Sequence, residues 1–386
     1  KINYYLSKKW GLEASMDSDG DGYTDAQEIA AGTSPIDTGD DLSPDLSNSV
    51  DAQIGEASGL DSIESSLALW LDATNIDGTF NSSLSDGDAV STWKDLSGNS
   101  FDAYQNYQDD DNPTYDAGTS SLVFDGIDDN YMLGSNYIFA ETSDGGKTIF
   151  IVAEPESSVN GEGYLYYFGA HSGADYHIHL NNNYIEFLAS SSHGGDWMKE
   201  NQTISGTSII TGHVEFSNNQ RLFLNGSMIS EDAITLTQIN GSTLLEGPVR
   251  STNYSSGPIS IGMESKFYRP STVGGGPRTF KGKIKEIIVF TKDLSDQEMI
   301  YINYYLSKKW GIQAKVDSDG DGFKDSIEEL LGSSSIDASD IPSIDLSDTV
   351  DAQIGEASGL GSIESNLALW LDASNIDMGS NITLSD

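Results

Sequence analysis

The sequence has no cysteine, few basic residues and no long apolar run. The absence of cysteine excludes a disulfide framework and any thiol chemistry, but by itself it does not indicate the cytosol. No apolar run approaches the roughly 20 residues that a membrane-spanning helix needs, so no span is expected in this segment. Apolar residues make up 37% and aromatic residues 10%, which is enough for a packed core.

Basic residues are scarce beside acidic ones: 19 Lys and Arg face 61 Asp and Glu, a formal net charge of −42. A nucleic acid partner is not expected, because phosphate binding needs a basic surface. Such an excess of carboxylates suits a protein bathed in divalent cations or salt, which screen the mutual repulsion. Solubility alone is the simpler alternative, and the charge does not decide between them.

What the sequence does contain is a long internal repeat. Residues 2–86 recur at 302–386 without a gap, with roughly two-thirds identity by direct count. The segment INYYLSKKWG starts at Ile2 and again at Ile302, and VDAQIGEASGL starts at Val50 and at Val350. A period this long suits one sizeable domain plus a linker. We therefore expect a tandem array, of which the chain holds one full period and an overhang.

Each copy contains an acidic segment that fits the twelve-position EF-hand loop. Asp stands at positions 1, 3 and 5, Gly at 6, a backbone carbonyl at 7, Asp at 9 and a bidentate Glu at 12. The predicted calcium ligands are Asp17, Asp19, Asp21, Tyr23, Asp25 and Glu28 in the first loop, and Asp317, Asp319, Asp321, Phe323, Asp325 and Glu328 in the second. So many carboxylates repel one another unless a hard cation lies among them, whereas the alternative is a solvated acidic turn.

Short helices are predicted after these loops, at Ala26–Ala31 and Ser326–Leu331, followed by Gly32–Asp37 and Gly332–Asp337. These segments resemble the thrombospondin type 3-like calcium repeats that link bacterial surface domains. The resemblance covers about 25 residues per copy. It implies a structural calcium site, with Asp37 or Asp337 as a further acceptor.

Between the loops, short apolar runs separated by Gly, Asn, Asp and Ser predict strands, which favours a two-sheet sandwich. The expected strands are Leu67–Asp72, Val90–Asp95, Leu122–Asp125, Thr148–Glu154, Tyr164–Phe168, Tyr184–Ala189, His213–Phe216, Arg221–Asn225, Ile259–Gly262 and Phe280–Thr291. Asn225-Gly226 is a hairpin-type turn. In the last strand, Lys281, Lys283 and Lys285 are expected on a solvent-exposed face.

One helix is predicted to dock on this sandwich. Ser295 and Glu298 form a capping box, and Met299, Ile302, Leu306 and Trp310 then make an apolar stripe that ends before Gly311. The segments LALWLDATNID, VSTWKDLSGN, LVFDGIDDNYM and GKIKEIIVFTKDLSDQEMIYINYYLSKKWGI, in that order, resemble the laminin-G-like, concanavalin A-like domains of bacterial surface proteins. The resemblance implies a mainly β jelly-roll sandwich, in a family whose members bind glycans, proteins or calcium.

No catalytic site is expected. Laminarinase-type hydrolases of the same superfamily carry E-x-D-x-x-E on one strand, and Glu154-Pro155-Glu156 has the wrong spacing. Weaker candidates for binding remain, each beside a structural alternative. The aromatic side chains that either stack on sugars or belong to the core are Tyr104, Tyr107, Trp197 and Tyr268. His177 and His179 form either half of a metal site or a pair of ordinary histidines. Asp125, Asp128 and Asp129 form either a calcium site or a polar turn.

These observations divide the chain into five parts. They are 1–12, the terminal helix of a preceding repeat; 13–45, a calcium-binding linker; 46–312, the sandwich with its terminal helix; 313–345, a second linker; and 346–386, the opening strand of the next sandwich. We expect a calcium-stiffened repeat of a large extracellular or bacterial cell-surface adhesin, in contact with neighbouring repeats and able to assemble head to tail into a fibre. The alternative is a carbohydrate-binding module of an adhesin or of a secreted glycan-active enzyme.

Overall fold

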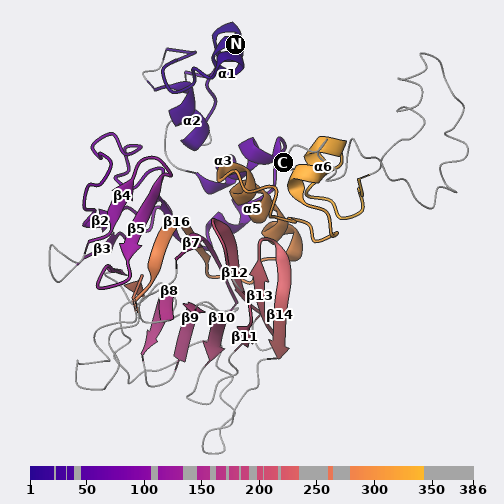
Figure 1. Cartoon of the computed structure of the whole chain (residues 1–386). Coiled ribbons are helices and arrows are strands. Elements are labelled where there is room, and N and C mark those ends of the chain that lie inside the picture. The colour runs from indigo at the N-terminus through magenta and orange to yellow at the C-terminus, as the bar shows by residue number, and fades with distance from the viewer. Residues whose placement is uncertain are drawn as a thin grey trace, which may run out of the picture.

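The computed structural model (Figure 1) describes most of the first period and the second calcium loop. The described residues are 1–20, 23–31, 33–38, 45–105, 112–133, 146–156, 162–170, 174–181, 184–190, 198–202, 204–215, 219–233, 260–263 and 279–342. Among them, no helix has the length and apolar character needed to cross a membrane.

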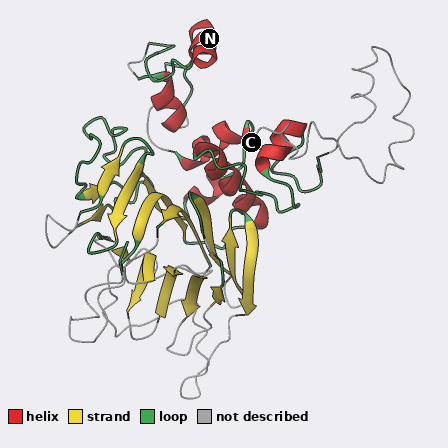
Figure 2. Cartoon of the chain, in the orientation of Figure 1, coloured by secondary structure: helices red, strands yellow, loops and turns green. Residues whose placement is uncertain are grey.

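Two antiparallel sheets form the body of the molecule, as Figure 2 shows in yellow. The first has the order β14-β13-β12-β7-β16-β5-β4, with β1 also paired to β16; the second has the order β11-β10-β9-β8-β15-β6-β3-β2. The first sheet consists of β1 (Leu67–Asp72), β4 (Thr114–Asp116), β5 (Ser121–Asp125), β7 (Lys147–Pro155), β12 (Ser208–Val214), β13 (Asn219–Leu224), β14 (Ser227–Ala233) and β16 (Lys281–Phe290). The second consists of β2 (Thr92–Trp93), β3 (Ala103–Tyr104), β6 (Tyr131–Leu133), β8 (Glu162–Ala170), β9 (Ala174–Asn181), β10 (Tyr184–Ser190), β11 (Met198–Glu200) and β15 (Ser260–Ile261).

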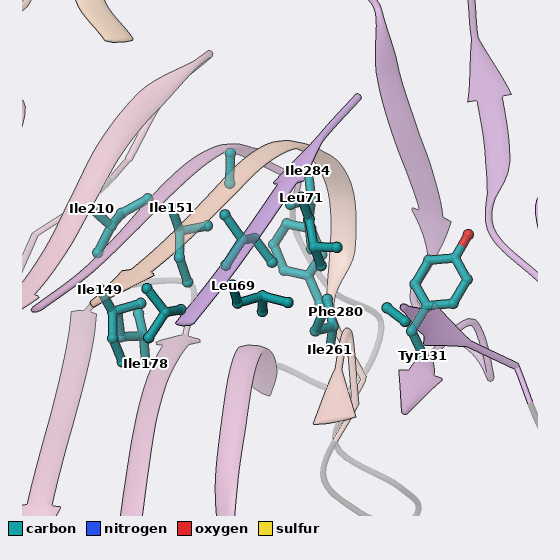
Figure 3. Close-up of a cluster of buried hydrophobic side chains, with 14 of the residues drawn as sticks. Leu69, Leu71, Tyr131, Ile149, Ile151, Ile178, Ile210, Ile261, Phe280 and Ile284 are labelled. Carbon is teal, nitrogen blue, oxygen red and sulfur yellow. The ribbon is translucent and has the colours of Figure 1, made fainter. Parts of the chain in front are cut away.

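The space between the two sheets holds the larger apolar core, part of which is drawn in Figure 3. Leu69 and Leu71 of β1 and Ile149 and Ile151 of β7 are almost completely buried there. Successive side chains of a strand point to opposite faces, so these alternate residues supply the inner face. This core fixes the relative position of the two sheets.

The opposite face of the first sheet is covered by helices, so it is buried as well. Trp70 of β1, Phe150 of β7 and Ile288 of β16 belong to a second apolar cluster. The helices that complete this cluster are α3 (Leu46–Ile54), α4 (Asp61–Glu64) and α5 (Asp296–Lys309). Figure 1 shows α3 beside α5 at this end of the molecule. Because both faces are covered, β1 is buried along its whole length.

A buried charged cluster joins α5 to the sheet. Lys309 forms ion pairs with Asp72 of β1 and with Glu286 of β16, the latter at 2.9 Å. Glu286 also accepts hydrogen bonds from Trp70 Nε1 at 2.9 Å and from Trp310 Nε1 at 2.7 Å. Burial alone would lower the pKa of Lys309, but the charges of Asp72 and Glu286 raise it well above its usual value. Lys309 therefore stays charged and balances two carboxylates beneath the helix.

The predicted fold class is confirmed: the protein is a mainly β, jelly-roll-type antiparallel sandwich with a docking helix at its C-terminal end. Most predicted strands lie within a residue or two of the observed ones, whereas Val90–Asp95 shortens to Thr92–Trp93, and His213–Phe216 is replaced by β12. The prediction that Lys285 faces solvent is wrong. Its side chain is buried under Trp310, and its Nζ lies 4.9 Å from the ring centroid, because α5 covers that part of β16.

The first copy of the repeated helix lies in a different environment. Helix α1 (Ile2–Trp10) exposes Tyr5, Leu6 and Trp10, whereas Tyr305 and Leu306 of α5 are almost completely buried. Figure 1 shows α1 and α2 (Asp25–Ala31) together, away from both sheets. The same sequence is therefore packed against the sandwich in one copy and solvent-exposed in the other.

Candidate metal centre

The second acidic loop runs from the end of α5 to α6 (Asp325–Leu331). Asp317, Asp319 and Asp321 each offer a carboxylate oxygen, and these atoms lie within 4.8 Å of one another. Backbone groups hold this arrangement: the N–H of Gly320 donates to Asp317 Oδ1 at 2.9 Å, and the N–H of Gly322 to Asp317 Oδ2 at 3.2 Å. Gly322 has a φ of 102°, a conformation that favours glycine at the turn of the loop. Three predicted ligands therefore converge.

Glu328, on the first turn of α6, is completely buried below this loop. Within the described part of the chain, neither of its carboxylate oxygens has a hydrogen-bond partner, and the same holds for Asp319 Oδ2 and Asp321 Oδ2. The nearby Ser335 hydroxyl donates to the carbonyl of Asp325 at 3.3 Å, and its effect on Glu328 is smaller than that of burial and of the neighbouring carboxylates. Buried carboxylate oxygens without donors are costly, and a bound cation would remove that cost.

The electrostatics of the loop show the same deficit of positive charge. Burial, followed by the charges of Asp319 and Asp321, raises the pKa of Glu328 to about 8. Burial is also the largest cause that raises the pKa of Asp319 to about 6. Both carboxylates are thus destabilised in their ionised form when no cation is bound. Oxygen-rich acidic sites of this kind suit Ca²⁺, which accepts six to eight oxygen ligands.

Asp325, a further predicted ligand, is held by hydrogen bonds from the loop and from α5. Its carboxylate accepts hydrogen bonds from the N–H of Ser318 at 2.8 Å, from the Ser318 hydroxyl at 2.9 Å and from the Ser307 hydroxyl of α5. This completely buried side chain ties the loop to the docking helix. Phe323, the predicted carbonyl ligand, is half-buried, and its N–H donates to Asp321 Oδ1 at 2.8 Å.

The first loop repeats part of this hydrogen-bond pattern where it is described. The N–H of Gly20 donates to Asp17 Oδ1 at 2.6 Å, and Ser18 donates to Asp25 through its N–H and its hydroxyl, both at 2.8 Å. Asp25 and Glu28 are completely buried, Asp19 is half-buried, and Tyr23 is exposed. Asp21 and Gly22 lie outside the described residues. Asp37 and Asp337, the further acceptors that the resemblance implied, are both exposed.

The other candidates are spread over the sandwich. Tyr104 is half-buried in β3, while Tyr107, Trp197 and Tyr268 lie outside the described residues. His179 is buried in β9 with its Nδ1 3.8 Å from Glu186 of β10, and the side chain of His177 is not described. Asp125, Asp128 and Asp129 bring three oxygens within 4.8 Å, yet Asp129 Oδ2 accepts from the N–H of Asp125 and Asp125 Oδ1 accepts from the N–H of Ile127. Two of these carboxylates thus accept backbone hydrogen bonds of the turn, and the three oxygens also lie close enough together to share a cation.

Sequence reasoning missed two features that position the second loop. One is the charged cluster of Asp72, Glu286 and Lys309, whose members are far apart in sequence and carry no motif. The other is the contact between the Asn225-Gly226 turn and the start of the loop: the sequence predicts the turn but not its neighbour.

Two segments of the chain match a known protein family. The family model described as Bacterial TSP3 repeat, a calcium-binding repeat, matches residues 17–38 and 317–337, which include both acidic loops. A search of curated proteins finds no match.

Solved structures with partial likeness include two kinds of protein. The binding domain of botulinum neurotoxin serotype D/C is 15% identical with a TM-score of 0.42, and the alignment covers 65% of this chain and 54% of that domain. The Ruminococcus gnavus IT-sialidase CBM40, bound to α2,3-sialyllactose, is 16% identical with a TM-score of 0.30, covering 41% of this chain and 82% of the other. The chain thus spans about half the length of the neurotoxin domain. Because these TM-scores are low, we assign the fold from the sheets of this chain and not from the likeness. The similarity to a known family lies in the two calcium-repeat segments.

Proposed function

We propose that this protein is a calcium-binding structural segment of a large extracellular protein, in which acidic loops set the position of successive β-sandwiches. The observation that carries the proposal is Glu328, which is completely buried beside Asp319 and Asp321 and, within the described residues, lacks a geometrically good hydrogen bond to either carboxylate oxygen. The proposed ligands of the second site are Asp317, Asp319, Asp321, Phe323 and Glu328, with Asp325 as the residue that holds the loop on α5. The first site uses the corresponding residues of the first copy.

Calcium binding to whole chains tests this proposal. We expect isothermal titration of the metal-free protein with CaCl2 to show two sites, and Glu328→Gln to remove one of them, because glutamine is a poor bidentate ligand. Glu329→Gln is the matched control: it changes an exposed neighbour on the same helix. A wild-type protein that binds no calcium at millimolar concentration would contradict the proposal.

The proposed biological role is non-enzymatic: an adhesive or structural repeat, arranged in series with others of its kind at a bacterial surface. The exposed apolar face of α1 supports this, because the corresponding residues of α5 are buried against a sandwich. The matches of both loops to a bacterial calcium repeat support an extracellular location, where millimolar calcium is present. Head-to-tail assembly into a fibre is part of the same proposal.

A carbohydrate-binding module remains the alternative. Within the described residues, it is supported by the half-buried Tyr104 of β3, next to the edge strand β2 of the second sheet, because an aromatic ring can stack on a sugar. A glycan array probed with the wild type and with Tyr104→Ala discriminates between the two proposals, because only the carbohydrate-binding module gives a signal that the substitution reduces.

A further inference from the structure

A hairpin turn of the sandwich lies directly against the first acidic residue of the second loop. Asn225 and Gly226 connect β13 to β14 with φ angles of 51° and 80°, which is typical of the tight turns that suit the twist of a hairpin. The carbonyl of Asn225 accepts a hydrogen bond from the N–H of Asp317 at 3.1 Å. The sandwich therefore holds the backbone of a proposed calcium ligand.

The approach between turn and loop is too close for any side chain at position 226. A Cβ placed on Gly226 would lie 2.1 Å from the carbonyl oxygen of Asp317 and 2.8 Å from its carbonyl carbon. Asn225 is itself fixed by β12: its N–H donates to the carbonyl of Ile209 at 2.8 Å, and its Oδ1 accepts from the N–H of Ile209 at 2.9 Å. The turn is thus an anchored support and not a loose loop tip.

Two more contacts hold the start of the loop. Lys315 donates through Nζ to the carbonyl of Ser205 at 2.8 Å and to that of Thr207 at 3.1 Å. Val316 is completely buried in the apolar cluster beneath the helices. The residues just before Asp317 are therefore fixed by a hydrogen-bonded lysine, by apolar burial and by the hairpin.

The first copy of the loop provides a comparison within the chain. Leu12 is 46% exposed, whereas Ile312 at the same place in the second copy is 8% exposed. Asp17 is exposed, whereas Asp317 is buried. Both loops contain the same DSDGDG segment, so the difference lies in what surrounds it.

From this geometry we infer that the Asn225-Gly226 turn is a positioning element for the second calcium site, which makes the two sites unequal and couples the second one to the sandwich. The inference rests on the proposed calcium binding. A loop held in its binding conformation loses less conformational entropy when the ion binds, so the second site binds calcium more tightly. Since the loop is joined to the sandwich, bound calcium also raises the unfolding temperature of the sandwich.

The test uses the full chain with one site removed. In a Glu28→Gln background, calorimetric titration with CaCl2 measures the second site alone, and Gly226→Ala is expected to weaken it by about fivefold or more, a change near 1 kcal/mol. Gly87→Ala is the matched control, because Gly87 also has a positive φ of 82° but a Cβ added to it would meet nothing within 4 Å. The calcium-induced rise in unfolding temperature is expected to shrink in Gly226→Ala and to persist in Gly87→Ala.

Lys315→Met is a second variant that leaves the turn unchanged and removes the hydrogen bonds to Ser205 and Thr207. It is expected to weaken the second site as well, and it decides the question if Gly226→Ala does not fold. Wild-type affinity in a folded Gly226→Ala protein, or in Lys315→Met if only that variant folds, overturns the inference. Equal affinities for the site left in Glu28→Gln and the one left in Glu328→Gln also overturn it. In both cases calcium still binds, which separates this failure from that of the proposed function.

Discussion

Lys309 shows how much depends on a single residue when cations are scarce. Its ammonium group is the basic partner of both Asp72 and Glu286, which are almost completely buried. Removing one partner of a buried charged cluster leaves the others without compensation, which costs far more than losing a surface ion pair. The repeat supplies the ideal comparison, because Lys9 occupies the same sequence position on the exposed helix α1.

We predict that Lys309→Met lowers the free energy of unfolding of the sandwich by about 3 to 5 kcal/mol. The same substitution at Lys9 is expected to change it by less than about 0.5 kcal/mol, as at other surface positions. Urea denaturation followed by tryptophan fluorescence measures both variants. Equal effects of the two substitutions would show that Lys309 does not compensate the buried carboxylates.

At the acidic loop, the sequence predicts part of the local geometry, whereas the ligand roles themselves stay predictions. The spacing of Asp317, Asp319 and Asp321 predicts that their carboxylates converge, because a glycine turn closes the loop within a few residues, and the structure brings them together. The orientation of Asp325 could not be predicted in the same way, because it depends on Ser307, a residue of the docking helix. A motif specifies local geometry, whereas a tertiary hydrogen bond decides which way a side chain turns.

At the level of elements, helix α5 was predictable because its signals are local. Ser295 accepts a hydrogen bond from the N–H of Glu298, whose carboxylate bonds back to the N–H of Ser295, as the capping box predicts. Helix α3 was missed although Asp45 caps it by accepting from the N–H of Asn48. Its sequence is mostly polar, and it is stabilised by burial of Leu46 and Val50 against other elements, which no local pattern reveals.

The junction of α3 and α4 is expected to be sensitive to pH through Glu64. Burial, followed by Asp45, raises the pKa of Glu64 from 4.5 to about 7. The folded protein then holds a proton that the unfolded chain has lost, so this contribution to stability is fully present below about pH 4.5 and is lost as the pH rises through about 7. We predict that Glu64→Gln, which mimics the protonated state, gains in unfolding temperature relative to the wild type as the pH is raised over this interval.

Scanning calorimetry of both proteins between about pH 4.5 and 8 measures this difference. The control is Glu56→Gln, at an exposed position between the same two helices. The prediction would be contradicted if the difference in unfolding temperature between the wild type and Glu64→Gln did not change with pH.

For the whole molecule, calcium is expected to act on the arrangement of parts more than on the fold of the sandwich. At millimolar calcium and a dissociation constant of about 10⁻⁴ M, occupancy adds only about 1.4 kcal/mol per site. This free energy is small compared with the stability of a domain, but it is enough to fix the orientation of a short acidic loop and the helix that follows it. In the first copy, α2 lies beside α3, so the first loop is the place where such a change would show.

We therefore predict that EGTA shortens the mean end-to-end distance of the full chain in small-angle X-ray scattering, while the far-ultraviolet circular dichroism of the sheets hardly changes. Glu28→Gln in the presence of calcium should reproduce part of this effect, because it removes only the first site. An identical scattering profile with and without EGTA would contradict the proposal that calcium at the first loop fixes the relative position of the parts.

The segment INYYLSKKWG gives one stretch of sequence two solvent environments in a single chain. An antibody raised against this peptide would find its epitope on α1 and would meet a covered one on α5. Chymotrypsin would likewise cut first beside Tyr5 and Trp10 and leave Tyr305 intact until the sandwich unfolds. Partial digestion would thus measure the fraction of copies of this peptide that are packed against a sheet and so protected from the protease.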